Sequence, residues 1–382
     1  MRRSFFSVLV AGLAALASPV RAADAPPVKI GAVLSLTGGA ATLGDPALKT
    51  LQLYVDKLNG QGGLLGRKLE LVAYDDGTEP AKANGFAKRL IDDDKVDVFI
   101  GGSTTGSTMA MWPAAEKADM PFISLGGGLV IVDPVKKGLF KVSHNDRMIA
   151  EKALMDMQKR GIKAIGLISE TSGYGQSGRK ETLALAPKYG VEVVVDETYA
   201  SKDTDVTAQL TKVKANPKAE AIFVFGFGQG AMIVTKNIAQ IGLKLPHYEA
   251  TGSASEDYIK LTGAASEGVR LPSPAMLVAT QLPDADPQKK VSVEYTTDFA
   301  ERYKSDASTF GAYARDAFFL WVDAVKRAGS FDKEKVRDAL EHTKGLVGTC
   351  GVINMSPQDH LGLDISAFKM VEVKNGAWTL SQ

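Results

Sequence analysis

The sequence has 382 residues, of which 45 are Lys or Arg and 44 are Asp or Glu. This near-neutral balance disfavours a nucleic-acid-binding protein, which needs a clustered basic surface. Cys350 is the only cysteine, so an internal disulfide is excluded and the fold must be stabilised by its apolar core. A chain of this length is too long for a single core, which predicts two domains.

Residues 1–23 have the pattern of a secretory signal peptide. Arg2 and Arg3 precede an apolar stretch at 5–16, and Ala22 follows at a suitable cleavage site. The stretch is too short to cross a bilayer comfortably, and no cysteine follows it for a lipid anchor. Cleavage would also remove Arg21, leaving 42 basic and 44 acidic residues and a formal charge of −2. We therefore expect an exported, soluble protein in the periplasm.

Apolar runs of strand length alternate with amphipathic segments along most of the chain. Strands are predicted at 28–34, 69–74, 96–100, 121–125, 164–169, 191–196 and 221–225. Helices are predicted at 46–58, 81–91, 110–118, 149–160, 178–189, 206–215 and 231–241. The first helix has Asp45 as its expected N-cap and Pro46 at its first position. Such alternation predicts an α/β fold with doubly wound parallel sheets.

Three segments interrupt this rhythm and are interpreted as crossings between two lobes. They lie at 140–145, 268–274 and 345–354. The prediction assigns residues 24–143 and 272–348 to lobe 1, and residues 144–271 and 349–382 to lobe 2. Beyond the last crossing, the Asn-Gly pair within 368–378 predicts a terminal β-hairpin.

The stretch GGSTTGST at 101–108 directly follows a predicted strand. Ser103, Thr104 and Thr105 therefore lie where a strand end meets a helix N-terminus, whose free amides and partial positive charge attract anions. No lysine is present for a phosphate-binding loop. Because such strand ends face the ligand crevice of an open α/β sheet, we expect a carboxylate to bind here. Helix capping without ligand binding is the alternative.

A second glycine run closes the next predicted strand and should lie beside the first. Gly126, Gly127 and Gly128 allow the backbone to approach a ligand closely and to donate amide hydrogens. A flexible loop is the alternative interpretation.

Residues 226–231 fit the dinucleotide-binding pattern G-x-G-x-x-G/A between a strand and a helix, with Glu249 about 20 residues further on. By itself this pattern indicates an NAD-dependent dehydrogenase, which is the alternative function from another class. The motif lies late in the chain, and dinucleotide cofactors are not expected outside the cytoplasm. Glycines that turn a strand into a helix at the edge of a cleft are therefore the preferred interpretation.

Histidine and aromatic residues suggest further contacts. The four histidines have no spacing that fits a metal site, with each other or with the cysteine. His144 lies at a predicted crossing, where it either hydrogen-bonds an acid or has a purely structural role. Tyr174 and Phe310 lie close to glycines near element ends, and are predicted either to enclose an apolar ligand from opposite lobes or to pack in the core.

Several segments in combination resemble the branched-chain amino-acid-binding proteins of ABC uptake systems. The resemblance is carried by VKIGAVLSLTG at 28–38, by GGLLGRKLEL at 62–71 and by the Asp pair at 75–76, and it continues to the Asp-Ala pair at 316–317. It implies a type I periplasmic binding protein, in which two α/β lobes joined by three crossover segments close on a solute. It further implies a monomer without cofactor or enzymatic activity that presents the solute to the permease subunits of an ABC transporter.

The resemblance also implies where the ligand binds. The carboxylate-binding hydroxyl falls on Thr105, and backbone contacts fall on Gly126 and Gly128. The apolar and aromatic lining falls on Leu43, Tyr174, Phe227 and Phe310.

One position departs from the family pattern. The acidic residue that pairs with the ammonium group of an amino acid falls on Thr251, and Glu249 could replace it only through a shift in strand register. A buried ammonium without a counter-charge costs several kcal/mol. The chain is similar to the branch of the family that takes up aromatic acids such as benzoates and hydroxycinnamates. We therefore expect a carboxylate with an apolar, aromatic body and no α-amine, in contact with Thr251 and His144.

Two points stay open at this stage. A branched-chain or other hydrophobic amino acid is the alternative ligand. Arg315 is either a second partner for the carboxylate or a structural arginine.

Overall fold

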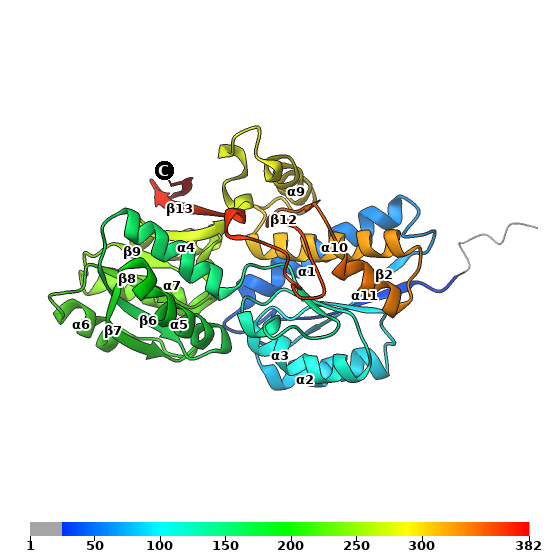
Figure 1. Ribbon diagram of the computed structural model, residues 1–382, viewed down its shortest axis with the longest axis horizontal. Helices are drawn as coiled ribbons and strands as arrows, with labels where there is room; N and C mark the ends of the chain where they lie inside the picture. Colours follow the sequence, from blue (N-terminus) through cyan, green and yellow to red (C-terminus); the bar gives the residue numbers. More distant parts are fainter. Residues whose placement is uncertain (1–24, 382) are drawn as a thin grey trace, which may run out of the picture.

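The strands of the two lobes form two separate sheets that lie side by side in the molecule (Figure 1). The computed structural model describes residues 25–381. The predicted signal peptide at 1–23 lies outside the described residues. The two sheets, each covered by helices, confirm the predicted α/β fold class with two doubly wound lobes.

The first lobe contains a five-stranded parallel sheet in the order β2-β1-β3-β4-β5. Its strands are β1 (Val28–Leu34), β2 (Leu69–Asp75), β3 (Val98–Gly101), β4 (Phe122–Ser124) and β5 (Leu139–Lys141). Its helices are α1 (Ala41–Gly60), α2 (Pro80–Asp92), α3 (Thr105–Lys117), α9 (Pro287–Tyr303), α10 (Thr309–Ala328) and α11 (Lys333–Glu341). Helix α1 packs against α10 and helix α2 against α3, on the two sides of the sheet (Figure 1).

The second lobe contains a seven-stranded sheet in the order β14-β13-β10-β9-β8-β6-β7. Its strands are β6 (Ala164–Glu170), β7 (Glu192–Tyr199), β8 (Ala221–Phe225), β9 (His247–Glu249), β10 (Arg270–Pro274), β13 (Phe368–Lys374) and β14 (Ala377–Leu380). Its helices are α4 (Asp146–Lys159), α5 (Gly173–Leu185), α6 (Thr207–Ala215), α7 (Gly228–Gln240) and α8 (Glu256–Thr262). In the described chain as a whole, the short 3-10 helices are η2 (Leu129–Ile131), η3 (Ala186–Tyr189), η4 (Thr251–Ser253), η5 (Gly263–Ser266), η6 (Ala275–Gln281) and η7 (Ile365–Ala367).

The predicted terminal hairpin is confirmed. Strands β13 and β14 pair antiparallel, and Asn375 and Gly376 between them have φ of 54° and 72°, the left-handed values that an Asn-Gly turn supplies. Strand β13 also pairs antiparallel with β10. The larger sheet is therefore mixed, with its parallel part between β10 and β7.

The three predicted crossings contain more regular structure than expected. Residues 140 and 141 belong to β5, residues 270–274 form β10, and 345–354 contains the hairpin of β11 (Leu346–Val347) and β12 (Val352–Ile353). The predicted lobe boundary at 271–272 falls inside β10, all of which pairs with β13. The other predicted lobe boundaries, at 143–144 and 348–349, remain a proposal.

Three predicted helix starts are wrong by five residues, because the helices expected from 46, 110 and 178 begin at 41, 105 and 173. The first helix begins at Ala41, so Asp45 is not its N-cap and Pro46 lies inside it. Ala40, the residue before this helix, is held by a contact that is distant in sequence, because its amide donates to the Thr78 hydroxyl at 3.1 Å. Helix α3 begins at Thr105 instead of residue 110, because the Thr104 side chain caps it.

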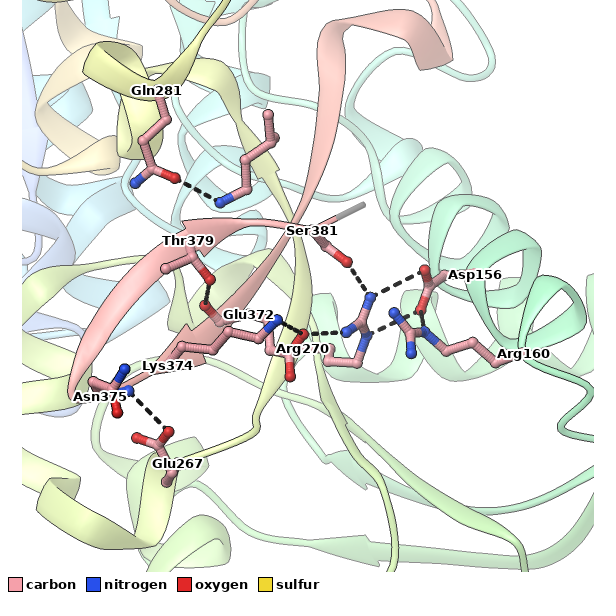
Figure 2. Close-up of polar contacts among 11 residues, drawn as sticks. Asp156, Arg160, Glu267, Arg270, Gln281, Glu372, Lys374, Asn375, Thr379 and Ser381 are labelled. Atoms are coloured by element: carbon pink, nitrogen blue, oxygen red, sulfur yellow. Dashed lines mark hydrogen bonds and ion pairs between the residues drawn. The ribbon is translucent and has the colours of Figure 1, made fainter.

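A buried arginine fastens the C-terminal hairpin to the rest of the second lobe (Figure 2). Arg270 of β10 donates from Nε to Asp156 Oδ2 of α4 at 3.1 Å and from Nη1 to Glu372 Oε2 of β13 at 2.5 Å. It also donates to the Ser381 hydroxyl, next to the end of the chain. One charged side chain thus connects a helix and two strands that are distant in sequence.

Candidate functional site

A small cavity lies between the two lobes, where the carboxyl ends of the strands face each other. Its volume is about 40 Å³, which is enough to hold water. It is lined by Leu43, Ser103, Thr104, Thr105, Leu125, Gly127, Ser143, His144, Ile149, Tyr174, Phe227, Thr251, Gly252, Phe310 and Tyr313. A volume this small means that the lobes are closed on each other.

Contacts between the lobes confirm this closed arrangement. The amide of Gln229 in α7 donates to the carbonyl oxygen of Gly39 before α1 at 3.2 Å. A Cβ atom on Gly127 would lie 2.6 Å from the ring of Tyr174, so only glycine lets the first lobe approach this tyrosine.

Of the twelve residues predicted for the site, all but Gly126 and Gly128 line this cavity. The sequence analysis missed five lining residues, namely Leu125, Ser143, Ile149, Gly252 and Tyr313. Tyr313 follows Phe310 by three positions in α10, and that spacing places two side chains on one face of a helix. This periodicity is the signal that could have found it.

The polar segment at 103–105 provides two hydroxyl groups with hydrogens still available. Thr104 is the N-cap of α3 and exchanges hydrogen bonds with Ser107, so its hydroxyl is fully engaged. The Ser103 hydroxyl accepts from the Ser35 amide at 3.1 Å, and the Thr105 hydroxyl accepts from the Gly128 amide at 2.9 Å. Within the described chain neither Ser103 nor Thr105 has an acceptor for its own hydroxyl hydrogen.

The glycine run does not supply the two donors that the sequence predicted. The Gly126 amide donates to the Ser124 hydroxyl at 3.0 Å, and the Gly128 amide is bound to Thr105. A Cβ atom on Gly128 would lie 2.5 Å from the methyl group of Thr105, so this glycine permits a close backbone approach. Gly127 does line the cavity, and among residues 25–381 its amide has no acceptor.

Aromatic side chains form much of the remaining wall. The ring of Tyr174 lies 5.0 Å from that of Phe225 and 6.0 Å from that of Phe227, all in the second lobe. Phe310 and Tyr313 come from α10 in the first lobe. Burial raises the pKa of the Tyr174 hydroxyl well above its ordinary value, so the phenol stays neutral. These rings suit an apolar ligand held between the lobes.

Six α-helices contribute to the lining from their N-caps or first four residues. The residues concerned are Leu43 of α1, Thr105 of α3, Ile149 of α4, Tyr174 of α5, Phe227 of α7 and Phe310 of α10. Because the N-terminus of each helix carries a partial positive charge, their convergence favours a negative group in the cavity.

His144 is a buried lining residue with an unsatisfied ring. Its imidazole stacks on Phe368 with ring centroids 3.7 Å apart, and neither ring nitrogen has a hydrogen-bond partner within the described chain. Burial and, to a smaller extent, the charge of Lys141 lower its pKa to about 3. The ring is therefore neutral, with one donor and one acceptor nitrogen.

None of the residues lining the cavity carries a carboxylate. Thr251 donates its hydroxyl hydrogen to the carbonyl oxygen of Pro272 at 2.7 Å. Glu249 is fully buried elsewhere in the lobe, hydrogen-bonded to His247, Thr235 and Ser253. Glu249 therefore does not supply the cavity with a carboxylate.

Arg315 and Cys350 lie behind the cavity lining. Arg315 pairs with Asp316 at 2.9 Å and its guanidinium lies 4.6 Å from the centre of the Phe319 ring. Asp316 in turn accepts from the amides of Thr349 and Cys350, so this pair holds the third crossing against α10. Arg315 is thus structural, and Cys350 is a buried free thiol.

The remaining motifs show no sign of a cofactor or metal site. In the dinucleotide-like segment, Gly228 has φ of +54° and packs so closely on Gly39 that a Cβ atom would lie 2.3 Å from its carbonyl oxygen. The glycines therefore serve the turn and the lobe contact. Over residues 25–381 no cluster of His, Cys, Asp and Glu suits a metal ion, and no helix there is both long and apolar enough to span a membrane.

Comparison with known proteins agrees with this geometry. The periplasmic binding protein family matches residues 27–377. The chain belongs to this family. The resemblance recognised in the sequence is therefore confirmed at the level of the family.

Individual relatives extend over nearly the whole chain. An extracellular ligand-binding receptor from Rhodopseudomonas palustris HaA2 is 30% identical with a TM-score of 0.88, covering 94% of this chain and 100% of that one. The substrate-binding protein LivJ of Streptococcus pneumoniae, solved with isoleucine, is 25% identical with a TM-score of 0.81, covering 92% and 98%. A leucine-, isoleucine-, valine-, threonine- and alanine-binding protein of Pseudomonas aeruginosa is 25% identical over 346 residues, covering 89% of this chain and 87% of its own.

Proposed function

We propose that this protein is the extracytoplasmic solute receptor of an ABC uptake system and that it binds a small carboxylate without an α-amine. The body of the ligand is apolar and aromatic, as in benzoates or hydroxycinnamates. The receptor acts as a periplasmic monomer, without cofactor or catalysis, and delivers its ligand to the permease subunits of the transporter.

The observation that carries this proposal is the unequal charge of the cavity. Helix N-termini, the Ser103 and Thr105 hydroxyls and the Gly127 amide all favour a negative group. No lining residue balances a positive one. Burying an ammonium there would cost several kcal/mol, whereas a carboxylate meets donors that have no other partner.

The aromatic wall supports the apolar part of the ligand. Tyr174 and Phe227 line the cavity from the second lobe and Phe310 and Tyr313 from the first, so a flat ring held there would meet aromatic side chains of both lobes. The cavity of about 40 Å³ has to widen to admit such a ring. The neutral His144 adds one donor and one acceptor, which suits a hydroxyl substituent on the ligand.

A branched-chain amino acid is the second candidate, favoured by the relatives that are named for binding leucine, isoleucine and valine. In that case the ammonium group would have to be bound by hydroxyl and carbonyl oxygens alone. Leu43 and Ile149 add aliphatic surface to the cavity, which would suit such a ligand.

A thermal-shift panel on the purified mature protein tests the proposal. We expect benzoate or 4-hydroxycinnamate to raise the melting temperature in a dose-dependent way, with little change from leucine, isoleucine or valine. Stabilisation by the amino acids alone would refute the ligand class and leave the receptor role intact. Stabilisation by NAD alone would refute both and favour the dehydrogenase.

A further inference from the structure

A fully buried lysine lies directly behind the loop that carries the carboxylate-binding groups. Lys141 ends strand β5 and its side chain has no exposed surface. Its Nζ donates to the carbonyl oxygen of Gly127 at 3.0 Å and to that of His144 at 3.4 Å. It does not line the cavity, so it cannot contact the ligand directly.

One peptide group connects this lysine to the cavity. The Gly127 carbonyl that accepts from Lys141 belongs to the same peptide as the Gly128 amide, and that amide donates to the Thr105 hydroxyl at 2.9 Å. A positive charge on the oxygen side polarises the peptide and strengthens its N–H as a donor. The hydroxyl that receives this bond becomes in turn a better donor toward the cavity.

We propose that Lys141 is a positioning residue that strengthens carboxylate binding through the Gly127–Gly128 peptide and the Thr105 hydroxyl. This inference rests on the proposed function only in that the ligand carboxylate lies at Thr105. It applies whether or not the ligand also has an amine.

One neighbouring carboxyl group favours the charged form of Lys141 that this role needs. The Asp146 amide donates to the Gly127 carbonyl oxygen at 3.2 Å, and Asp146 Oδ1 accepts from the Leu129 amide at 3.1 Å, so a carboxyl group borders the same loop. Burial lowers the pKa of Lys141 to about 7, and ionised Asp146, whose own pKa is raised by burial, opposes that shift. The ammonium form therefore predominates below about pH 7. The other ionisable group that faces it closely, the His144 imidazole, is neutral.

If Lys141 has only a structural role, its loss should affect ligand affinity differently than if its charge acts through the peptide. Loss of a structural contact would weaken every ligand by a similar factor. Loss of the transmitted charge would weaken carboxylates selectively, because a neutral group gains much less from a strengthened donor. Selectivity between an acid and its amide therefore separates the two roles.

The test compares the wild type with Lys141→Met, which keeps the length of the side chain and removes its charge. Affinities are measured by calorimetry for three pairs: benzoate with benzamide, 4-hydroxycinnamate with its amide, and leucine with leucinamide. We expect the acid that binds to lose about tenfold in affinity, with its amide changing by less than about twofold. Lys152→Met, at a half-buried lysine of α4, removes the same charge and should leave both values unchanged.

A double-mutant cycle with Thr105→Val completes the test. If the effect passes through the Thr105 hydroxyl, Lys141→Met should have little further effect on acid binding in the Thr105→Val background. Full additivity, or equal losses for acid and amide, would overturn the inference. If the wild type shows no preference for any acid over its amide, the carboxylate assignment itself fails. A preference that Lys141→Met leaves undiminished overturns only the role of the lysine.

Discussion

Thr251 donates its hydroxyl hydrogen to the carbonyl oxygen of Pro272 at 2.7 Å, which joins η4 at the cavity to strand β10. Family members that bind amino acids are expected to have a carboxylate at this position. Here the side chain is short, uncharged and bound to the backbone, so it contributes no negative charge to the cavity. The identity of the ligand depends largely on this one position.

Replacing Thr251 with Glu should therefore change the ligand class. A carboxylate at the cavity wall would pair with an ammonium group and would repel a ligand that is only anionic. We expect Thr251→Glu to gain measurable affinity for leucine and to lose at least about tenfold for aromatic acids. Thr251→Gln, of similar size and no charge, is the matched control in calorimetric titrations. If both variants behave alike, size and not charge determines the selectivity.

Replacing Thr105 with Val should weaken carboxylate binding directly. The variant keeps the shape of the side chain but loses the hydroxyl, and a hydrogen bond to a charged group contributes about 1.5–3 kcal/mol. The expected rise in Kd is roughly 10- to 100-fold. Thr105→Ser keeps the hydroxyl and should bind nearly as well as the wild type. An unchanged Kd for Thr105→Val would remove this residue from the site.

His144 should make the folded protein sensitive to mild acid. Its pKa lies at about 3 in the folded state against 6.5 for an unperturbed imidazole, so between these values the unfolded state binds a proton that the folded state does not. Stability from this group is complete above pH 6.5 and declines as the pH falls toward 3.

The variant His144→Phe removes this titration and keeps a ring to stack on Phe368. Its free energy of unfolding should fall less steeply between pH 6 and 4, by up to about 1.4 kcal/mol per pH unit. Urea unfolding curves at pH 7, 6, 5 and 4 provide the comparison. Parallel losses in the two proteins would show that His144 is not responsible.

Arg270 should matter for stability and not for affinity. Replacing it with Met removes the shared partner of Asp156 and Glu372, which still pair with Arg160 and Lys374. The cost should therefore be about 1–3 kcal/mol, below that of a buried charge left with no partner. Ligand affinity of the remaining folded protein should be unchanged, because none of these residues lines the cavity. Chemical unfolding and calorimetry on the same preparation separate the two effects. A large loss of affinity would link the hairpin to the binding site.

Local sequence patterns were sufficient to predict the range of a strand where the strand is buried on both faces of its sheet. The predicted ranges of β1 and β8 agree with the structure, because a parallel strand covered on both faces reads as a continuous apolar run. Strand β10 was missed for the opposite reason. It contains Pro272 and Pro274, and its partner β13 lies about a hundred residues further along the chain, so nothing local indicates a strand.

That the candidate residues gather at one cavity was predictable from sequence, but their hydrogen bonding was not. Strand ends in an open α/β sheet meet at one crevice, which placed Ser103, Thr105 and Gly127 correctly at one cavity. The sequence could not show that Gly128 donates to Thr105 instead of to a ligand. Nor could it show that Lys141 lies buried behind them, because this requires β5 to pair with β4.

The most direct test of the central claim uses ligands that differ only in the α-amine. Calorimetry on the mature protein would compare 4-methylpentanoate with leucine, and 3-phenylpropanoate with phenylalanine. Because the cavity favours an anion and does not compensate an ammonium, each deamino acid should bind at least about 100-fold more tightly than its amino acid. Tighter binding of leucine or phenylalanine than of its deamino partner would contradict the account.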